Sequence, residues 1–267
     1  MPDTKFILDS EKCIACGLCV ADCFPGYITM GENGPVYPGS CMMCGHCAAV
    51  CPVNAITLPE LDPETVMDYD EESFKVDPEK LLNSIRHRRS IRNYRSEKVS
   101  PEHLSLILEA GRCAPTASNT QKTRFIVVQE GLSEFKELLW SEMPAIIEGM
   151  KASGSPAASG LSRFLDHKNS GFRDDLFFNA PAYVLVITDN VWDAGLAASD
   201  MEMVAYACGA GMLHSGYLKR VVSSSPKLTG WLGINEGESI ACCMLLGYPA
   251  VSYPRTAGRK MPKVTMK

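Results

Sequence analysis

The sequence Cys13-x-x-Cys16-x-x-Cys19-x-x-x-Cys23 recurs downstream as Cys41-x-x-Cys44-x-x-Cys47-x-x-x-Cys51-Pro52. These two runs hold eight of the twelve cysteines of the chain. Two-residue gaps let a chain curl around a cubane iron–sulfur cluster and present three thiolates to it, while the fourth cysteine of each run ligates the neighbouring cluster. The spacing therefore predicts two 4Fe-4S clusters, one held by Cys13, Cys16, Cys19 and Cys51 and the other by Cys41, Cys44, Cys47 and Cys23.

The repeat extends beyond the cysteines, because every cysteine of the first run has its counterpart 28 residues later. The same offset relates Ile28-Thr29 to Ile56-Thr57 and Gly17 to Gly45. Self-similarity at a fixed period indicates two copies of one structural unit. We expect each copy to consist of a strand, a cysteine loop, a short helix and a strand, related by a pseudo-two-fold axis. Roughly residues 3–60 resemble the two-cluster bacterial ferredoxins.

Two other uses of paired cysteines suit this pattern less well. Zinc sites use Cys-x-x-Cys pairs but have no need of a third and fourth cysteine at these spacings. Disulfide frameworks are typical of small secreted domains, and the amino-terminal residues lack the charged and apolar regions of a signal peptide. Oxygen-labile clusters and reduced thiols favour a cytoplasmic protein.

The composition of the 267-residue chain is that of an ordinary globular protein, with 46% hydrophobic and 21% charged residues. A net charge of −5 gives no reason to expect nucleic acid, and no apolar run is long enough to span a bilayer. Residues 61–78 are acidic and punctuated by proline, which predicts a linker. We therefore expect a ferredoxin-like domain over residues 1–60 and a second domain over residues 79–267.

Helices and strands alternate irregularly in the second domain, which predicts the α+β class. Helices are expected to begin at Asp77-Pro78-Glu79 and Ser100-Pro101-Glu102, where a capping side chain precedes proline and an acid. Strands are expected over residues 124–129, 183–188 and 239–246, and helices over 133–150, with a break near Pro144, and over about 193–222.

Three stretches of this domain are informative together, although none is specific alone. They are Arg88-Arg89-Ser90-Ile91-Arg92, then Ala114–Gln121 before a buried strand, and finally Leu246-Gly247-Tyr248-Pro249 with Arg259-Lys260. In this order and spacing they resemble the FMN-dependent nitroreductase family, over about residues 79–267. The resemblance implies an α/β/α sandwich with a mixed, mainly antiparallel sheet. As a whole, the chain resembles ferredoxin–nitroreductase fusion proteins.

The resemblance also implies which residues bind FMN. The phosphate and ribityl chain would be held by Arg88, Arg89, Ser90, Arg92, Arg259 and Lys260. The other subunit of a homodimer would contribute Pro115, Thr116, Ala117 and Asn119. A backbone N–H near the flavin N5 atom would come from the turn of Ser215 and Gly216. Taken alone, a basic cluster such as residues 88–92 is also typical of a solvated helix end.

Clusters carry single electrons, whereas a flavin exchanges one or two and can deliver a hydride. The resemblance therefore implies an oxidoreductase that takes electrons from a low-potential ferredoxin-like or flavodoxin-like donor and passes them via FMN to a nitroaromatic or quinone-like acceptor. No catalytic side chain is expected. Two alternatives stay open: a non-catalytic electron carrier or redox sensor, and an NAD(P)H-dependent flavin reductase with the clusters as electron exit. Gly209-Ala210-Gly211 lacks the third glycine of a dinucleotide-binding turn.

Several other residues carry weaker expectations. Within residues 141–178, the aromatic side chains either cover the substrate side of the flavin or form ordinary core; they are Phe164, Phe172, Phe177 and Phe178. The cysteines outside the two runs are expected to be small buried hydrophobes; they are Cys113, Cys208, Cys242 and Cys243. His46 and His87 are expected to be surface or loop residues without a partner.

Overall fold

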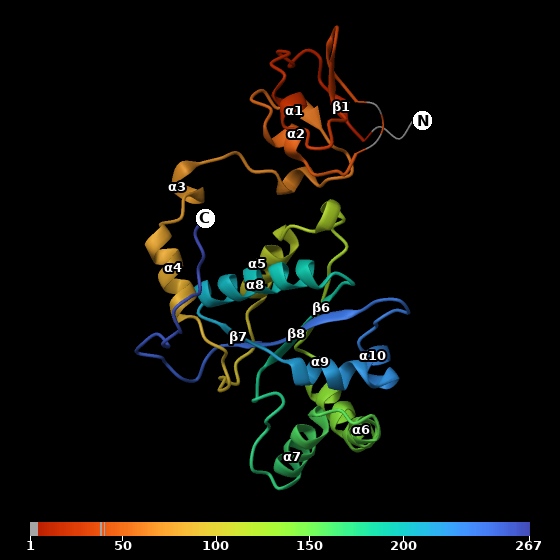
Figure 1. The fold of residues 1–267 in the computed structure, drawn as a ribbon, viewed down its shortest axis with the longest axis vertical. Coiled ribbons are helices and arrows are strands. Elements are labelled where there is room, and N and C mark those ends of the chain that lie inside the picture. Colours follow the sequence, from red (N-terminus) through yellow and green to blue (C-terminus); the bar gives the residue numbers. More distant parts are fainter. Residues whose placement is uncertain (1–4, 38, 40) are drawn as a thin grey trace. The chain divides into compact units, whose positions relative to one another are not determined.

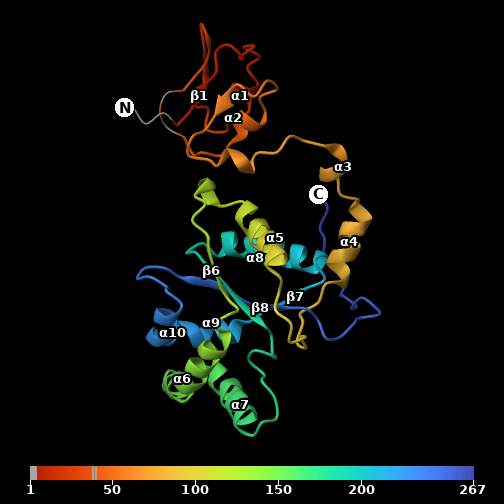
Figure 2. The ribbon, with the colours of Figure 1, turned by 180° about the vertical axis from the view of Figure 1, so that it is seen from behind.

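The computed structural model describes residues 5–37, 39 and 41–267 and divides the chain into two compact units (Figures 1 and 2). The cysteine unit comprises Met1–Lys75 with Ser118–Thr120, and the sheet unit comprises Val76–Ala117 with Gln121–Lys267. The expectation that the amino-terminal residues form no signal peptide rests in part on residues 1–4, which lie outside the described residues. Among the described helices, none is long and apolar enough to cross a membrane.

The backbone of the cysteine unit repeats as its sequence does. Its elements are β1 (Ile7–Leu8), α1 (Leu18–Ala21), β2 (Thr29–Gly31), β3 (Gly34–Val36), α2 (His46–Ala49) and β4 (Ile56–Thr57). Strand β1 pairs antiparallel with β4, and β2 with β3. Gly17 at φ 76° and Gly45 at φ 79° precede the two helices in a left-handed conformation that favours glycine. The predicted two-copy arrangement of strands, cysteine loops and short helices is confirmed.

The core of the cysteine unit contains two of the predicted cluster ligands. Its buried residues are Phe6, Cys19, Ile28, Cys47, Ile56 and Leu58. Residues 61–78 then carry two short helices, η1 (Pro63–Thr65) and α3 (Glu71–Phe74), which Asp62 and Asp70 cap. Every residue from 62 to 78 is exposed, which is what a solvated connector requires.

The sheet unit contains a four-stranded sheet in the order β5-β6-β8-β7. Its strands are β5 (Arg124–Val128), β6 (Ala182–Ile187), β7 (Gly211–His214) and β8 (Ile240–Gly247). The three predicted strands are confirmed as β5, β6 and β8, and each described pairing is antiparallel. Strand β7 was not expected from the sequence.

Helices cover both faces of this sheet, so the α/β/α sandwich is confirmed (Figures 1 and 2). The helices of this unit are α4 (Pro78–His87), α5 (Pro101–Cys113), α6 (Leu132–Ala152), α7 (Ala157–Asn169), α8 (Val191–Ala207), α9 (Gly216–Ser223) and α10 (Pro226–Trp231). The short η2 (Ala117–Asn119) begins in this unit and ends in residues that group with the cysteine unit. Helices α5 and α8 lie on one face, and α6, α7, α9 and α10 lie on the other. Strand β6 serves both cores, because alternate side chains such as Tyr183 and Val184 point to opposite faces.

The expected break at Pro144 is wrong, because α6 runs unbroken from Leu132 to Ala152. A proline removes one helical hydrogen bond and crowds the preceding turn. Pro144 is exposed, however, while Met143 and Ile147 are buried on the other side of the helix. Burial of that apolar face offsets the cost of the proline.

The single helix expected over about residues 193–222 is also wrong. Helix α8 ends at Ala207, Gly209 follows at φ 73°, and the chain then enters β7. In β7 the adjacent side chains of Met212 and Leu213 join different cores, one on each face of the sheet. A composition rich in alanine and glycine is compatible with either a helix or a strand over residues 211–214. Pairing with β8 makes this segment a strand.

The phenylalanines of residues 141–178 mostly form core. Phe164 and Phe177 are buried with α6 and α7, and Phe178 packs against the same cluster. Phe172 differs, since 66% of it is exposed.

Candidate cofactor sites

Two cavities of the cysteine unit are each lined by four cysteines. One is lined by Cys13, Cys16, Cys19 and Cys51, and the other by Cys23, Cys41, Cys44 and Cys47. Each cavity takes three cysteines from one run and the fourth from the other run. This is the grouping that two 4Fe-4S clusters require, and ligation itself stays a prediction.

The walls of these cavities suit a cluster. Backbone N–H groups of Met43 and Ala55 donate to the sulfur atoms of Cys41 and Cys51, each at 3.3 Å, and such bonds help to set a cluster's potential. The hydroxyl of Tyr37, on the wall of the second cavity, is buried without a hydrogen-bond partner among the described residues. A thiol-lined cavity with an unsatisfied donor therefore fits a group whose sulfides accept hydrogen bonds.

A third cavity, of about 230 Å³, lies in the sheet unit beside Arg88 and Arg89, and we call it the arginine cavity. The arginine segment is fixed against β7, because the N–H of Ile91 donates to the carbonyl of Met212 at 3.0 Å. This approach requires a glycine at position 211, where a Cβ would lie 2.3 Å from Cγ1 of Ile91. Local backbone proximity thus places the two arginines beside β7.

Glu202 of α8 links three elements at this cavity. Its carboxylate accepts a hydrogen bond from Nη1 of Arg88 at 2.7 Å and lies 3.5 Å from Nε2 of His214. Burial by itself would raise the pKa of Glu202, but hydrogen bonds from His214 and Arg88 outweigh it and lower the pKa. Hydrogen bonds to Cys242 and then Glu202 raise the pKa of His214 to about 9. At neutral pH an ionised carboxylate therefore lies between two cations.

Residues near the carboxyl end close over the arginine cavity. The ring nitrogens of His87 bond the hydroxyl of Tyr206 at 3.0 Å and the carbonyl of Tyr253 at 2.8 Å. The guanidinium of Arg89 lies 5.7 Å from the centre of the Tyr253 ring, which is a cation–π contact. The expectation that His87 lacks a partner is wrong, because its ring nitrogens bond Tyr206 and Tyr253. Both partners are distant in sequence, which is why the sequence did not indicate them.

One buried hydroxyl near this cavity lacks a partner. Tyr94 is buried, and its hydroxyl has no hydrogen bond to any described residue. Burial raises the pKa of Tyr94, and the charges of Arg92 and Glu202 act on it. Tyr94 is not among the residues that line the cavity, so the two guanidinium groups carry the comparison: they fit an anionic group such as the phosphate of FMN.

The remaining predicted FMN residues lie outside the arginine cavity. Ser90 and Arg92 are not among its lining residues, and neither are Arg259 and Lys260, which are exposed in a segment without regular structure. Ser215 caps α9, and its N–H already donates to the carbonyl of Cys243 at 2.8 Å. The N–H of Gly216, at the start of α9, is the one of this pair that helix geometry leaves open for a ligand.

The loop after α5 is fastened to α8 at its start. The N–H of Ala117 donates to the buried carboxylate of Asp193 at 3.0 Å, and Thr116 accepts the N–H of Gln121 at 3.0 Å. Asn119 has φ 52° and groups with the cysteine unit, whereas Pro115 belongs to the sheet unit. A contribution of this loop to a second subunit's site stays a prediction.

Sequence reasoning missed the polar surroundings of Arg88 and Arg89: Glu202 pairs with Arg88, the Tyr253 ring lies against Arg89, Tyr206 lines the same cavity, and His214 approaches Glu202. One signal was available, because Glu202 interrupts an apolar stretch of α8 and shares a helix face with Tyr206, four residues later. Among the other cysteines, Cys243 is buried as expected and Cys113 is exposed. Cys113 lies at the last turn of α5, where its thiol contacts Glu109.

Two thiol-lined cavities and an arginine-lined cavity in one chain are what we expect of a redox protein that combines iron–sulfur clusters with an anionic cofactor. Comparison with known families agrees. The nitroreductase family model matches residues 85–248, and the model of a 4Fe-4S dicluster domain matches residues 5–52. The chain belongs to the nitroreductase family and carries an additional 4Fe-4S dicluster domain, as in ferredoxin–nitroreductase fusion proteins.

Individual relatives are similar over 64–70% of this chain. An Archaeoglobus fulgidus protein named NADH dehydrogenase/NAD(P)H nitroreductase is 29% identical over 171 residues, which are 64% of this chain and 86% of that protein. A Desulfitobacterium hafniense nitroreductase solved with bound FMN has a TM-score of 0.55 at 26% identity, covering 70% of this chain and 98% of its own. A Bacteroides fragilis nitroreductase with bound FMN has a TM-score of 0.57 at 22% identity, with the same coverage, and supports the fold alone.

Proposed function

We propose that this protein takes single electrons through two 4Fe-4S clusters and passes them via FMN to an electron-poor organic acceptor, of nitroaromatic or quinone-like type. Its class is that of a flavin- and iron–sulfur-dependent oxidoreductase. One observation carries the proposal: eight cysteines group into two four-cysteine cavities in the same chain as an arginine cavity. A flavin exchanges one or two electrons and can deliver a hydride, whereas clusters carry single electrons.

In this proposal the residues of the chain bind and orient the cofactors and exclude water from them. Arg88 and Arg89 bind the phosphate directly, and Glu202 orients Arg88 through the 2.7 Å hydrogen bond. Tyr253 and His87 hold residues 249–253 over the cavity. The eight cysteines ligate the clusters in the crossed arrangement.

We place FMN between two copies of the chain. A cavity of about 230 Å³ is smaller than the roughly 300–1,000 Å³ of typical ligand pockets, so one chain encloses only part of such a cofactor. In a homodimer the second subunit would contribute Pro115, Thr116, Ala117 and Asn119. The late Arg259 and Lys260 would return to the phosphate. The FMN-bound relative from D. hafniense supports this choice of cofactor. Oxygen-labile clusters support a reducing, cytoplasmic setting with a low-potential protein donor.

Anaerobic stopped-flow measurements test the proposal. The holoprotein is mixed with reduced ferredoxin, and cluster and flavin absorbance are followed before and after addition of 4-nitrobenzoate or menadione. We expect cluster reduction first, flavin reduction next, and flavin reoxidation by the acceptor over many turnovers. In Cys51→Ala the donor-driven flavin reduction should slow sharply. Reoxidation by protein acceptors alone would support an electron carrier or redox sensor and contradict the proposal.

A second candidate is an NAD(P)H-dependent flavin reductase with the clusters as electron exit. The name of the A. fulgidus relative favours this candidate. It predicts rapid bleaching of the flavin by NADH or NADPH in the absence of any low-potential donor. It also predicts that Cys51→Ala leaves this bleaching unchanged, which separates it from the main proposal.

A further inference from the structure

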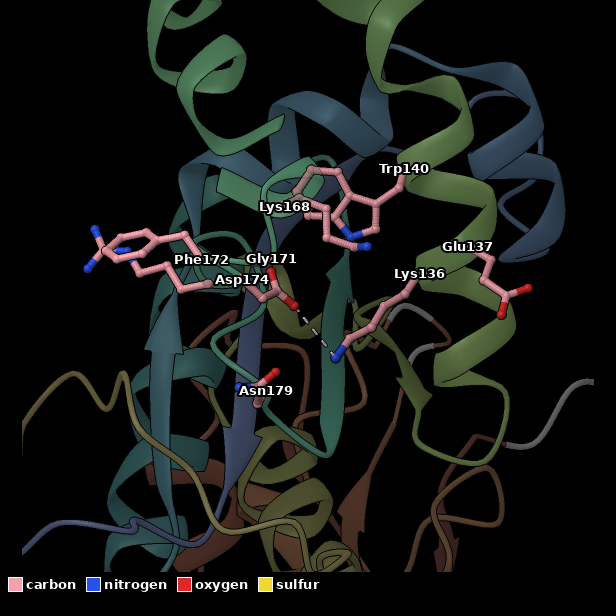
Figure 3. A pocket seen from close by; sticks show the side chains of 9 residues that line it. Lys136, Glu137, Trp140, Lys168, Gly171, Phe172, Asp174 and Asn179 are labelled. Carbon is pink, nitrogen blue, oxygen red and sulfur yellow. Dashed lines mark ion pairs between the residues drawn. The ribbon is translucent and has the colours of Figure 1, made fainter. Parts of the chain in front are cut away.

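A further cavity of the sheet unit shares none of the lining residues of the arginine cavity. Its volume is about 770 Å³, and it opens between the first half of α6, the end of α7 and the segment that leads into β6 (Figure 3). Lys136 and Trp140 come from α6, Lys168 from α7, and Phe172 and Asp174 from the following segment. We call it the lysine–tryptophan cleft.

Lys136 carries a charge that its surroundings satisfy only in part. Its side chain is 23% exposed, and the nearest carboxylate oxygen, Oδ2 of Asp174, lies 3.9 Å away, beyond hydrogen-bond distance. The ammonium also lies 4.8 Å from the centre of the Phe177 ring. Burial lowers the pKa of Lys136 in spite of Asp174. The Lys136 ammonium makes no hydrogen bond to any described residue, so its three N–H donors remain for a ligand.

Asp174 is held by the protein and cannot turn to neutralise Lys136 more closely. Its Oδ1 atom accepts the backbone N–H groups of Leu176 at 3.1 Å and Phe177 at 2.8 Å. The other nearby acid, Glu137, directs its carboxylate away from Lys136 (Figure 3). The lysine therefore faces the cleft with an incomplete set of partners.

Aromatic side chains line the same cleft. Phe172 is 66% exposed, yet it is fixed by a T-shaped contact with the His167 ring at 5.0 Å and by a hydrogen bond from its N–H to the carbonyl of His167 at 3.0 Å. The guanidinium of Arg173 lies 5.4 Å from the Phe172 ring and pairs with Asp175. The Phe172 ring points away from Lys136 and Trp140 (Figure 3), so Trp140 offers the apolar wall next to the two lysines.

We infer that the lysine–tryptophan cleft binds a small planar aromatic carboxylate, separately from the cofactor sites. The carboxylate pairs with Lys136 and Lys168, and the ring lies against Trp140. A partly desolvated ammonium forms strong charge-assisted hydrogen bonds with an anion, and the indole buries one face of the ring. This site requires neither FMN nor the clusters.

Calorimetric titration of the holoprotein with 1-naphthoate tests the inference, with the neutral 1-naphthamide as the matched ligand. We expect one naphthoate site per chain and binding of the amide that is weaker by about tenfold or more, because the amide cannot pair with the ammonium. Lys136→Gln should weaken naphthoate binding by about tenfold. Lys151→Gln makes the same change on α6 outside the cleft and should leave binding unchanged.

Lys136 is mostly buried, so its replacement could disturb the fold. Lys168→Gln alters an exposed residue of the same cleft and should weaken binding about threefold or more. The inference is overturned if naphthoate fails to bind at millimolar concentration, or if the amide binds equally well. It is also overturned if Lys168→Gln binds as the unaltered protein does, or if binding perturbs the flavin absorption spectrum and survives both substitutions.

Discussion

The guanidinium of Arg88 donates to the carboxylate of Glu202 across 2.7 Å, and the two residues are 114 positions apart in the chain. Glu202 is 9% exposed, and the same carboxylate faces His214 at the end of β7. One buried charge therefore joins the end of α4, the middle of α8 and the edge strand of the sheet. A partly buried ion pair of this kind is costly to break, because removal of one partner leaves the other desolvated and unpaired.

Glu202→Gln should destabilise the sheet unit by about 2–3 kcal/mol, because Arg88 then loses its anionic partner. It should also lower FMN retention, since Arg88 is no longer oriented. All three tryptophans, Trp140, Trp192 and Trp231, lie in the sheet unit, so urea unfolding followed by their fluorescence reports on it. Glu148→Gln breaks an exposed pair with Lys151 and should cost less than about 1 kcal/mol. Equal costs for both variants would contradict the prediction.

The raised pKa of His214 should make stability depend on pH. His214 titrates near pH 9 in the folded protein and near its ordinary value of about 6.5 in the unfolded chain. Its stabilisation is therefore fully present below about pH 6.5 and is lost as the pH rises through about 9. The difference in unfolding free energy between the unaltered protein and His214→Gln should shrink over this interval. A difference that stays constant with pH would rule out the proposed titration.

Crossed ligation of the clusters should appear as pairs of variants with matching spectra. Cys51→Ala and Cys13→Ala remove ligands lining one cavity, whereas Cys23→Ala and Cys41→Ala remove ligands lining the other. Within each pair, the surviving cluster should give the same electron paramagnetic resonance spectrum after reduction, and iron content should fall to about half. Cys113→Ala, at an exposed cysteine outside both cavities, should retain all iron. If Cys51→Ala and Cys41→Ala gave the same spectrum of the surviving cluster, the crossed arrangement would be refuted.

Gly211→Ala should separate the arginine segment from β7, because the new Cβ would lie 2.3 Å from Cγ1 of Ile91. We expect a loss of about 1–3 kcal/mol, as for other overpacked positions, and weaker FMN retention. Shortening the opposing side chain in Gly211→Ala/Ile91→Ala should restore part of the FMN binding, whereas Ile91→Ala alone should not improve it. Failure of the double variant to recover any flavin would show that the loss has another cause.

Arg89→Gln should release FMN more readily than Arg92→Gln does, because Arg89 lines the arginine cavity and Arg92 does not. Loss of a charge-assisted bond to a phosphate would weaken binding by about tenfold or more. Equilibrium dialysis with flavin fluorescence measures both constants. A larger effect of Arg92→Gln would mean that the phosphate lies outside this cavity.

Much of this protein could be predicted from short-range patterns. The 28-residue repeat predicted two copies of a cysteine loop, and the structure shows them with matching backbone conformations, such as φ 52° at both Ala15 and Met43. Capping residues before proline likewise located the starts of α4 and α5, since Asp77 and Ser100 accept N–H groups of their first turns. These features depend on neighbours within a few residues, so the sequence states them directly.

Long-range features were not predictable in the same way. Strand β7 was mistaken for helix because Met212 and Leu213 suit either structure until pairing with β8 places them on opposite faces. The partners of Arg88 were missed because an isolated arginine carries no information about a carboxylate 114 residues away. Lys136 and Asp174 meet for a similar reason, through the approach of α6 and the segment before β6.

By itself, then, the sequence determined the spacing of the eight thiols, because local chain geometry decides how a loop curls around a cluster. It also determined the order of the three segments that resemble the nitroreductase family. Only the tertiary structure decided which polar groups face Arg88 and that Lys136 faces a cleft, because burial and charge pairing arise where distant elements meet.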